Sequence, residues 1–251
     1  MQNELNPAGT APLGNLKIVP ETEPATGKAQ LVHMNNDLAA VINIKNFVTP
    51  IQSHPLENEF NRSIKRGIDI LVSFIVIMVA LSWLIPLMAI LIKLDSKGPV
   101  FFLQKRNKRR GELFSCIKFR SMVSNTDADI IPAGKNDGRI TKLGRFLRKH
   151  YLDELPQFFN VLWGDMSIIG PRPHMVSENV KYDGLIKNYS ARHKVKPGIT
   201  GLAQAMGYVG ETDNPHKMKA RVDMDIFYIR HWSFRLDLII VYRTLRKSVG
   251  L

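Results

Sequence analysis

Two adjacent carboxylates, Asp153 and Glu154, are the first candidates for catalysis in this chain. An ionised carboxylate is a weak nucleophile that needs an electrophilic centre such as phosphorus. The pair stands just before Pro156, and apolar residues recur around it at helical spacing, namely Leu155, Phe158, Phe159 and Leu162. Because proline is tolerated in a first helical turn, the pair is predicted at the N-terminal end of a helix, where unpaired amides favour ionised carboxylates. Acidic residues also favour helix starts for structural reasons alone, so the surrounding residues must decide.

Cationic side chains on two further elements could bind phosphate oxygens near the pair. The alternation of residues 113–122 predicts a strand with Lys118 and Arg120 on one face, although a solvated strand face has the same pattern. Arg148 lies on the basic side of a predicted amphipathic helix at 140–149. Such a helix either lies on a membrane surface or packs on the core with its basic face in solvent.

Arg172 stands in a short segment that the sequence makes rigid, Gly-Pro-Arg-Pro at 170–173. Prolines on both sides hold its backbone, so its guanidinium can be aimed with little entropy to lose. The planar fork of an arginine suits phosphate oxygens. Further along, three cations at 192–194 precede a glycine-rich turn at 196–201, a pattern that would bind an anion through side chains and backbone amides.

The elements that must position these residues include a membrane segment, because the chain is almost wholly apolar from Ile70 to Ile92. As a helix rising about 1.5 Å per residue, this run would extend roughly 35 Å, enough to cross a hydrocarbon core of about 30 Å. Lysines and arginines flank it on both sides, and the positive-inside rule places both flanks in the cytoplasm. A helix that enters, bends near Pro86 and returns satisfies the rule, and Ser82 could hydrogen-bond the backbone groups that the proline frees. We predict this re-entrant hairpin, with a full span as the alternative.

The C-terminal segment from Met218 to Val241 is predicted to be helical. Tyr228 and Trp232 lie among several arginines, as in a helix at the level of lipid headgroups. A core-packed helix with a basic outer face fits the same pattern equally well.

The composition favours anionic partners. The 251 residues carry a formal net charge of +13, which suits nucleic acid, anionic lipid or phosphorylated small molecules. The single cysteine, Cys116, excludes an intrachain disulfide, and the sequence has no zinc-ligand spacing, GxGxxG motif or Walker lysine loop. Residues 1–35 have the composition of a disordered tail rather than of a signal peptide, and 38–49 could form a short strand or helix.

Five motifs follow one another in the chain: Lys-Phe-Arg-Ser-Met at 118–122, Leu-Asp-Glu-Leu-Pro-Gln at 152–157, Gly-Asp-Met-Ser at 164–167, Gly-Pro-Arg-Pro at 170–173 and Lys-Pro-Gly-Ile-Thr-Gly at 196–201. With the apolar run and Gly-Pro-Val-Phe-Phe at 98–102, the chain resembles the bacterial sugar transferases, which are monotopic polyprenyl-phosphate phosphoglycosyl transferases. The resemblance covers about 62–251 and is strongest to the UDP-glucose lipid-carrier type of exopolysaccharide synthesis. Two features differ from members of the family: Ile85 precedes Pro86 where the small members have serine, and residues 1–60 hold none of the transmembrane helices of the larger members.

The resemblance implies an α+β fold, mainly α, in which a re-entrant membrane helix hairpin, amphipathic interfacial helices and a small β element surround a cytosolic active site. It divides the chain into a largely disordered tail (1–60), a membrane-inserted segment (61–97) and a cytosolic catalytic domain (98–251). The implied location is the bacterial inner membrane, with the catalytic domain on the cytoplasmic side. Membrane lipids are expected partners and a homodimer is one option, whereas nucleic acid is not expected.

The implied reaction transfers sugar-1-phosphate, with glucose favoured, from a UDP-sugar to undecaprenyl phosphate and releases UMP. Asp153 would be the nucleophile of a phosphosugar-aspartyl intermediate, and Glu154 with Asp153 would hold Mg²⁺. The implied phosphate-binding residues are Lys118, Arg120, Arg148 and Arg172. Secondary candidates for contacts with the nucleotide, substrate or metal are Lys196, Thr200, Gln204 and Asp225.

Two other classes of function remain open from the residues themselves. A metal-dependent phosphatase or nucleotidyl transferase could use the same acid pair. A membrane-tethered basic protein could bind nucleic acid or act as a scaffold without catalysis. The identity of the sugar also stays open, because no residue reports the configuration at one hydroxyl.

Overall fold

The computed structural model describes residues 51, 53–124, 134, 137–210 and 214–248, all of which belong to one unit, Ile44–Leu251. The predictions for 1–35 and 38–49 lie outside the described residues. The helices are α2 (Glu59–Val76), α3 (Ser82–Asp95), α4 (Lys142–Lys149), α5 (Gln157–Trp163), α6 (Val176–Asp183), α7 (Leu202–Ala205), α8 (Pro215–Arg230) and α9 (Phe234–Ser248). The strands are β1 (Phe101–Asn107), β2 (Leu113–Phe119), β3 (Ser167–Ile169) and β4 (Gly198–Thr200). A 3-10 turn at Pro55–Glu57 precedes α2.

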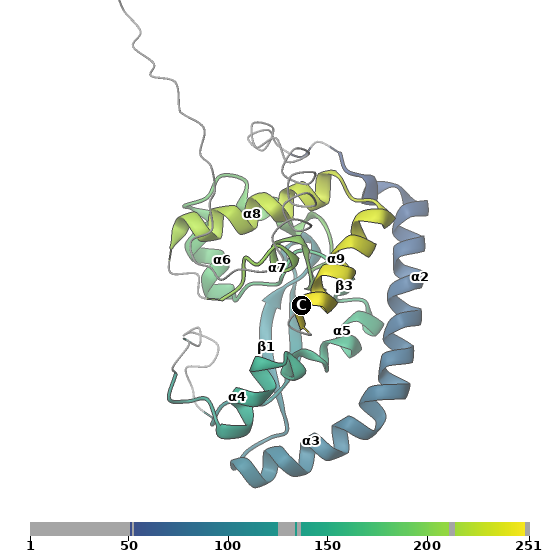
Figure 1. Cartoon of the computed structure of the whole chain (residues 1–251). Helices are drawn as coiled ribbons and strands as arrows, with labels where there is room; N and C mark the ends of the chain where they lie inside the picture. The colour runs from purple at the N-terminus through teal and green to yellow at the C-terminus, as the bar shows by residue number, and fades with distance from the viewer. Residues whose placement is uncertain (1–50, 52, 125–133, 135–136, 211–213, 249–251) are drawn as a thin grey trace, which may run out of the picture. The chain divides into compact units, whose positions relative to one another are not determined.

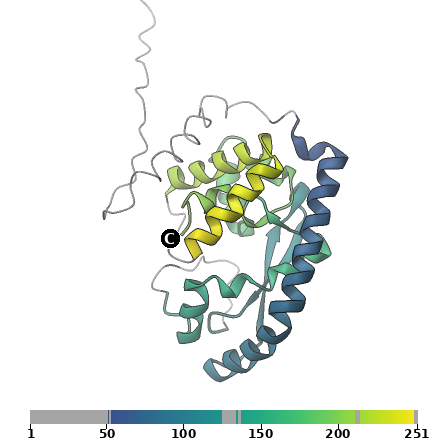
Figure 2. The same ribbon diagram turned by 45° about the vertical axis from the view of Figure 1, so that its right-hand side comes forward.

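Helices α2 and α3 form one continuous helix with a bend between them. The bend lies at Ile77–Leu81, where the backbone hydrogen bonds widen to the π pattern, a known cause of helix kinks. Figure 1 shows α3 leaving the bend in a different direction from α2, and Figure 2 shows the same bent helix along one edge of the fold. Pro86 lies inside α3, on the C-terminal side of the bend. Ser82 Oγ donates to the carbonyl of Met78 in the widened turn, 2.7 Å away.

One face of this bent helix packs on the rest of the fold, and the other face is apolar and exposed. The buried side chains of α3 are Leu84, Met88 and Ile92, and they pack with Phe119 of β2 and Leu147 of α4. This packing connects α3 to β2 and α4. The exposed apolar side chains include Phe60, Ile64, Leu71, Phe74, Ile75, Met78, Val79, Trp83, Ile90 and Leu94. By length and composition, the helix Glu59–Asp95 is able to cross a membrane.

The β structure of the described residues is small. Strands β1 and β2 form an antiparallel hairpin, with Phe101 opposite Phe119 and Asn107 opposite Leu113. Its turn requires positive φ at Arg110 and Gly111, and glycine adopts such angles at no steric cost. Strands β3 and β4 are parallel and short. The predicted α+β class with mainly helical content is therefore confirmed.

Helix α4 lies close to the backbone that follows β2. Thr141 caps the helix, its Oγ1 accepting from the amide of Gly144 at 2.9 Å. A Cβ on Gly144 would stand 1.9 Å from the carbonyl oxygen of Ser121, so only glycine permits this approach. The approach positions the end of α4 and the turn that follows it.

The predicted C-terminal helix is divided into α8 and α9. Tyr228 and Trp232, which the sequence places equally well at a membrane interface or in a core, are buried. The Tyr228 hydroxyl donates to Ile169 O (3.1 Å) and to Asp237 Oδ1 (2.9 Å), and Trp232 Nε1 donates to Asp237 Oδ2 (3.0 Å). These two aromatic residues therefore belong to the core.

Candidate active site

The two carboxylates lie in a tight turn between α4 and α5. A 3-10 turn at Leu152–Glu154 follows Tyr151, whose φ of 56° reverses the chain direction after α4. Pro156 then precedes the first residue of α5, as the sequence predicts. The side chains of Asp153 and Glu154 are both buried, although each carries a carboxylate. Buried charges need partners, so the contacts of each carboxylate determine what the site can do.

Glu154 is held by two cations from different elements. Lys118 Nζ on β2 donates to Glu154 Oε1 at 3.0 Å. Arg172 donates through Nη1 to Oε2 at 2.9 Å and through Nη2 to Oε1. Burial alone would raise the pKa of Glu154, but Arg172 and Lys118 outweigh it and hold that pKa below its usual range. Glu154 is therefore a fixed anion that orients the two cations.

Asp153 has a different environment, because no described residue donates a hydrogen bond to its carboxylate. Burial raises the pKa of Asp153 above its ordinary value, and the negative charge of Glu154 raises it further. Lys118, Arg148 and Arg172 act in the opposite direction. The result is a carboxylate with free lone pairs beside three cations, which suits a nucleophile for a phosphate-bearing substrate.

The Arg172 loop is held by two further arginines that the sequence does not single out for this task. Arg192 Nη2 donates to the carbonyl of Arg172 at 2.7 Å, and Arg106 Nη1 donates to the carbonyl of Pro173 at 3.0 Å. Arg192 is itself buried in an ion pair with Asp225, at 2.6 Å between Nη2 and Oδ2. These contacts fix the loop backbone, so they position the guanidinium that holds Glu154.

Arg120 is not part of this cluster in the structure. Strand β2 ends at Phe119, and the Arg120 guanidinium turns to the C-terminal end of α3. It donates to Ser96 O at 2.7 Å, to Ile92 O at 3.3 Å and to Lys97 O. Arg120 thus satisfies the last carbonyls of α3, a favourable position for a cation.

The four secondary candidates also have partners or surroundings away from the two carboxylates. Thr200 Oγ1 lies 2.8 Å from Thr244 Oγ1, and Gln204 Nε2 donates to Ile199 O at 3.2 Å. Asp225 is paired with Arg192, and Lys196 lines a pocket against α2. Of the cations at 192–194, Arg192 is therefore committed to a buried pair rather than available to an anion.

We use the term dyad cluster for the residues that the structure does bring together, which are Asp153, Glu154, Lys118, Arg148 and Arg172.

The sequence of the matched region identifies the family. The bacterial sugar transferase family matches residues 60–250. The chain belongs to this family. It is 51% identical over 202 residues to the "UDP-glucose:undecaprenyl-phosphate glucose-1-phosphate transferase" of Klebsiella pneumoniae, a match that covers 80% of this chain and 43% of that protein. The protein of the same name from Escherichia coli K12 is 48% identical over 202 residues, with 80% and 43% covered.

A third relative is matched over nearly its whole length. The chain is 41% identical over 187 residues to the "Exopolysaccharide production protein PSS" of Rhizobium leguminosarum bv. phaseoli, covering 72% of this chain and 93% of that protein. By contrast, the chain spans less than half of the Klebsiella and Escherichia proteins. The family match confirms the family that the ordered motifs indicate, and it includes the whole dyad cluster.

Proposed function

We propose that this sugar transferase moves glucose-1-phosphate from UDP-glucose to undecaprenyl phosphate and releases UMP. The observation that carries the proposal is the unequal environment of two buried neighbours, because Glu154 is held by Lys118 and Arg172 while Asp153 accepts no hydrogen bond from the described residues. The names of the Klebsiella and Escherichia relatives support the donor and the acceptor. The reaction would be an early membrane step of exopolysaccharide or other glycoconjugate synthesis.

In the first displacement, a carboxylate oxygen of Asp153 attacks the phosphorus that bears the sugar. A bond forms between that oxygen and phosphorus, and the bond from phosphorus to the bridging oxygen breaks. UMP leaves with the bridging oxygen, and the sugar phosphate stays on Asp153 as an acyl phosphate. The attacking group must be ionised, and the cations around Asp153 favour that form.

In the second displacement, a phosphate oxygen of the lipid attacks the same phosphorus. The bond to Asp153 breaks, the carboxylate is regenerated, and the product is undecaprenyl diphosphate glucose. Lys118 and Arg172 each use only part of their donors on Glu154, so the remaining N–H groups are available to phosphate oxygens as charge builds there. Arg148 on α4 adds positive charge near Asp153.

We propose magnesium as the metal of this site, held by the dyad together with the substrate. Mg²⁺ takes oxygen ligands, commonly one or two carboxylates together with substrate phosphates and water. Among the described residues, no group of three or more acidic, histidine or cysteine side chains could hold a metal, so the ion would depend on Asp153, Glu154 and the donor diphosphate. Asp153 has free lone pairs for this purpose. A bound ion would supply charge neutralisation of the diphosphate.

We also propose that the bent helix enters the cytoplasmic leaflet of the inner membrane and returns on the same side. Its N-terminal part contacts the catalytic domain, because Arg66 donates to Val161 O (2.5 Å) and Leu162 O (2.8 Å). Its C-terminal part contacts the same domain through Ile92 and Arg120. A straight span would separate these ends by about 30 Å of hydrocarbon. In the proposed position, α4, which packs against α3, lies near headgroup level and the dyad cluster faces the lipid phosphate.

Turnover tests the proposed reaction. Purified protein is incubated with UDP-glucose, Mg²⁺ and undecaprenyl phosphate, and UMP is measured with and without the lipid. Release of UMP that depends on the lipid supports the transferase, whereas free glucose-1-phosphate formed without lipid would indicate hydrolysis. A panel of UDP-sugars then ranks the donors, and preference for a sugar other than glucose would contradict the glucose assignment.

Cysteine labelling tests the proposed topology. Single cysteines replace Ile64 and Lys97 in a Cys116→Ser background, and each is exposed to a membrane-impermeant reagent in oriented membranes. The proposal expects both positions to react from the cytoplasmic face. Reaction from opposite faces would establish a full span.

A further inference from the structure

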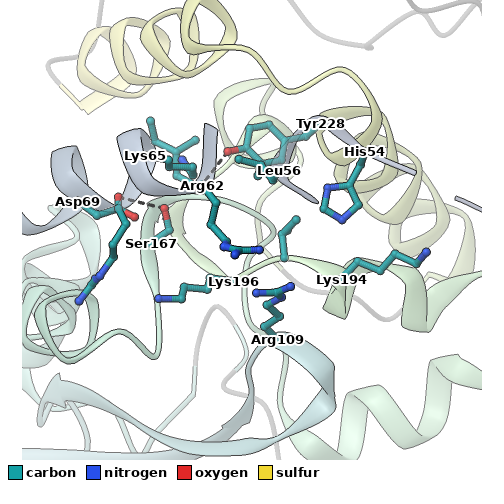
Figure 3. A pocket seen from close by; sticks show the side chains of 13 residues that line it. His54, Leu56, Arg62, Lys65, Asp69, Arg109, Ser167, Lys194, Lys196 and Tyr228 are labelled. Carbon is teal, nitrogen blue, oxygen red and sulfur yellow. Dashed lines mark hydrogen bonds between the residues drawn. The ribbon is translucent and has the colours of Figure 1, made fainter. Parts of the chain in front are cut away.

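A pocket apart from the dyad cluster lies between the N-terminal half of α2 and the segments around β3 and β4 (Figure 3). Its empty volume is about 500 Å³, including the open mouth, and no residue of the dyad cluster lines it. Six of its lining side chains are lysines or arginines: Arg62, Lys65, Arg66, Arg109, Lys194 and Lys196. Asp69 is the one carboxylate among the lining residues. The pocket therefore carries a large excess of positive charge.

Some of these cations already have partners in the fold. Lys65 is paired with Asp237 at 2.7 Å, and Arg66 donates to two carbonyls at the end of α5. Arg62 has an exposed partner one turn earlier, Glu59, at 2.9 Å. By contrast, the side chains of Arg109 and Lys196 form no hydrogen bond or ion pair with any other described residue. In Figure 3 the side chain of Arg109 rises into the pocket from the wall opposite α2.

Lys196 and Arg66 bring two cations to the same small region of the pocket wall. Both approach Gly164, because a Cβ there would lie 3.4 Å from Lys196 Nζ and 3.5 Å from Arg66 Nη2. Burial lowers the pKa of Lys196, and the charges of Arg66 and Arg109 lower it further. The charges of Asp69 and Asp165 act in the opposite direction but do not restore the ordinary pKa.

The two nearby carboxylates form their bonds with groups other than Lys196 and Arg109. Asp69 accepts from Ser167 Oγ and from the amide of Ile168, both at 3.0 Å. Asp165 is paired with Lys108 at 2.9 Å. Like charges that are held together in a partly buried site repel one another. The positive charge of the pocket therefore favours binding of an anion that does not belong to the described residues.

We propose that this pocket is a second anion site that binds a phosphate group, with Arg109 and Lys196 as its main donors. A guanidinium and an ammonium group are the side chains best suited to phosphate oxygens. The phosphate could belong to a phospholipid headgroup or to a soluble molecule. The outer side of α2 at this level exposes Phe60 and Ile64, which places the pocket beside an apolar surface. No step of the proposed transfer requires this site.

Binding of inorganic phosphate tests the site without turnover. Calorimetric titration compares the wild type with Arg109→Gln/Lys196→Gln and with Lys187→Gln/Lys217→Gln, a control of equal charge change at exposed positions outside the pocket. For a soluble phosphate, we expect the pocket variant to lose one phosphate site, or to bind at least about tenfold more weakly, while the control keeps it. Arg172→Gln should leave this site intact, which separates it from the dyad cluster.

Vesicle binding tests the lipid source with the same variants. Sedimentation with phosphatidylcholine vesicles, with and without phosphatidylglycerol, measures the part of membrane binding that depends on an anionic headgroup. If the pocket binds a lipid headgroup, we expect the binding that depends on phosphatidylglycerol to fall several-fold more in the pocket variant than in the control. The proposal is overturned if the pocket variant and the control bind phosphate equally and also respond equally to phosphatidylglycerol.

Discussion

Arg172 donates to both carboxylate oxygens of Glu154, and the neighbouring Asp153 is left without a hydrogen bond from the described residues. Two adjacent acids are thereby given different roles by their surroundings. Glu154 holds the cations in place, and the Asp153 carboxylate keeps lone pairs that no described residue uses. The predictions below test this division and the elements that maintain it.

Replacing Glu154 by Gln removes the anion that Arg172 and Lys118 share. Breaking a fully buried ion pair costs about 3–5 kcal/mol, but the Arg172 side chain is 36% exposed, so we expect the free energy of unfolding to fall by about 2 kcal/mol. Lipid-dependent UMP release should fall at least about tenfold because the cations lose their fixed positions. Thermal unfolding and turnover measure the two effects. Glu112→Gln, at an exposed position, is the control, and a Glu154→Gln enzyme of normal stability and activity would contradict the assigned role.

The pH dependence of kcat/KM should show an acid limb that belongs to Asp153. Burial raises the pKa of Asp153, and only the ionised form attacks, so activity falls as pH decreases through that raised pKa. The charge of Arg148 lowers this pKa, so Arg148→Gln should move the limb to higher pH.

Arg145→Gln, on an exposed position of the same helix, should leave the limb where it is in the wild type. Equal limbs in the Arg148 and Arg145 variants would show that the limb reports another group.

Arg120→Lys separates a structural role from phosphate binding. Lysine keeps the charge but loses the planar fork that reaches the carbonyls of Ile92 and Ser96. We expect the free energy of unfolding to fall by about 2 kcal/mol with little change in the KM for UDP-glucose. Arg172→Lys should show the reverse, with a larger effect on turnover. A raised KM at unchanged stability for Arg120→Lys would restore its predicted role in phosphate binding.

Gly144→Ala tests whether the approach of α4 to the chain after β2 positions the dyad. The added Cβ would meet the carbonyl oxygen of Ser121 at 1.9 Å, so the helix must move. We expect destabilisation by about 2–3 kcal/mol and a loss of activity in the folded fraction, because Arg148 lies in this helix and the dyad turn follows it. Gly184→Ala has no atom within 4 Å of its Cβ and should change stability by less than about 0.5 kcal/mol. Similar effects of the two substitutions would contradict this positioning.

Local sequence patterns were sufficient to predict several parts of the site. The position of Asp153 and Glu154 before α5 follows from Pro156 and the apolar spacing, and the cap at Thr141 begins the predicted basic helix. The family itself follows from the order of five motifs.

Contacts between distant parts of the chain could not be predicted in this way. Lys118 and Arg120 have the spacing of two residues on one strand face, but β2 ends at Phe119, between them. Arg120 instead donates to a carbonyl at the end of α3. Asp225 carries no local sign that Arg192 neutralises it from another helix. Such pairings depend on which buried charges meet in the folded core, and a single sequence does not contain that information.

Mass spectrometry of the trapped enzyme tests the central claim, which is that Asp153 carries the sugar phosphate between donor and acceptor. The protein is mixed with UDP-glucose and Mg²⁺ without the lipid, quenched and digested. We expect the peptide containing Asp153 to gain the mass of a hexose phosphate, to lose it when undecaprenyl phosphate is added before the quench, and never to gain it in Asp153→Asn, while Asp223→Asn behaves as the wild type. An active preparation that shows no adduct, and whose kinetics require both substrates to be bound together, would contradict the account.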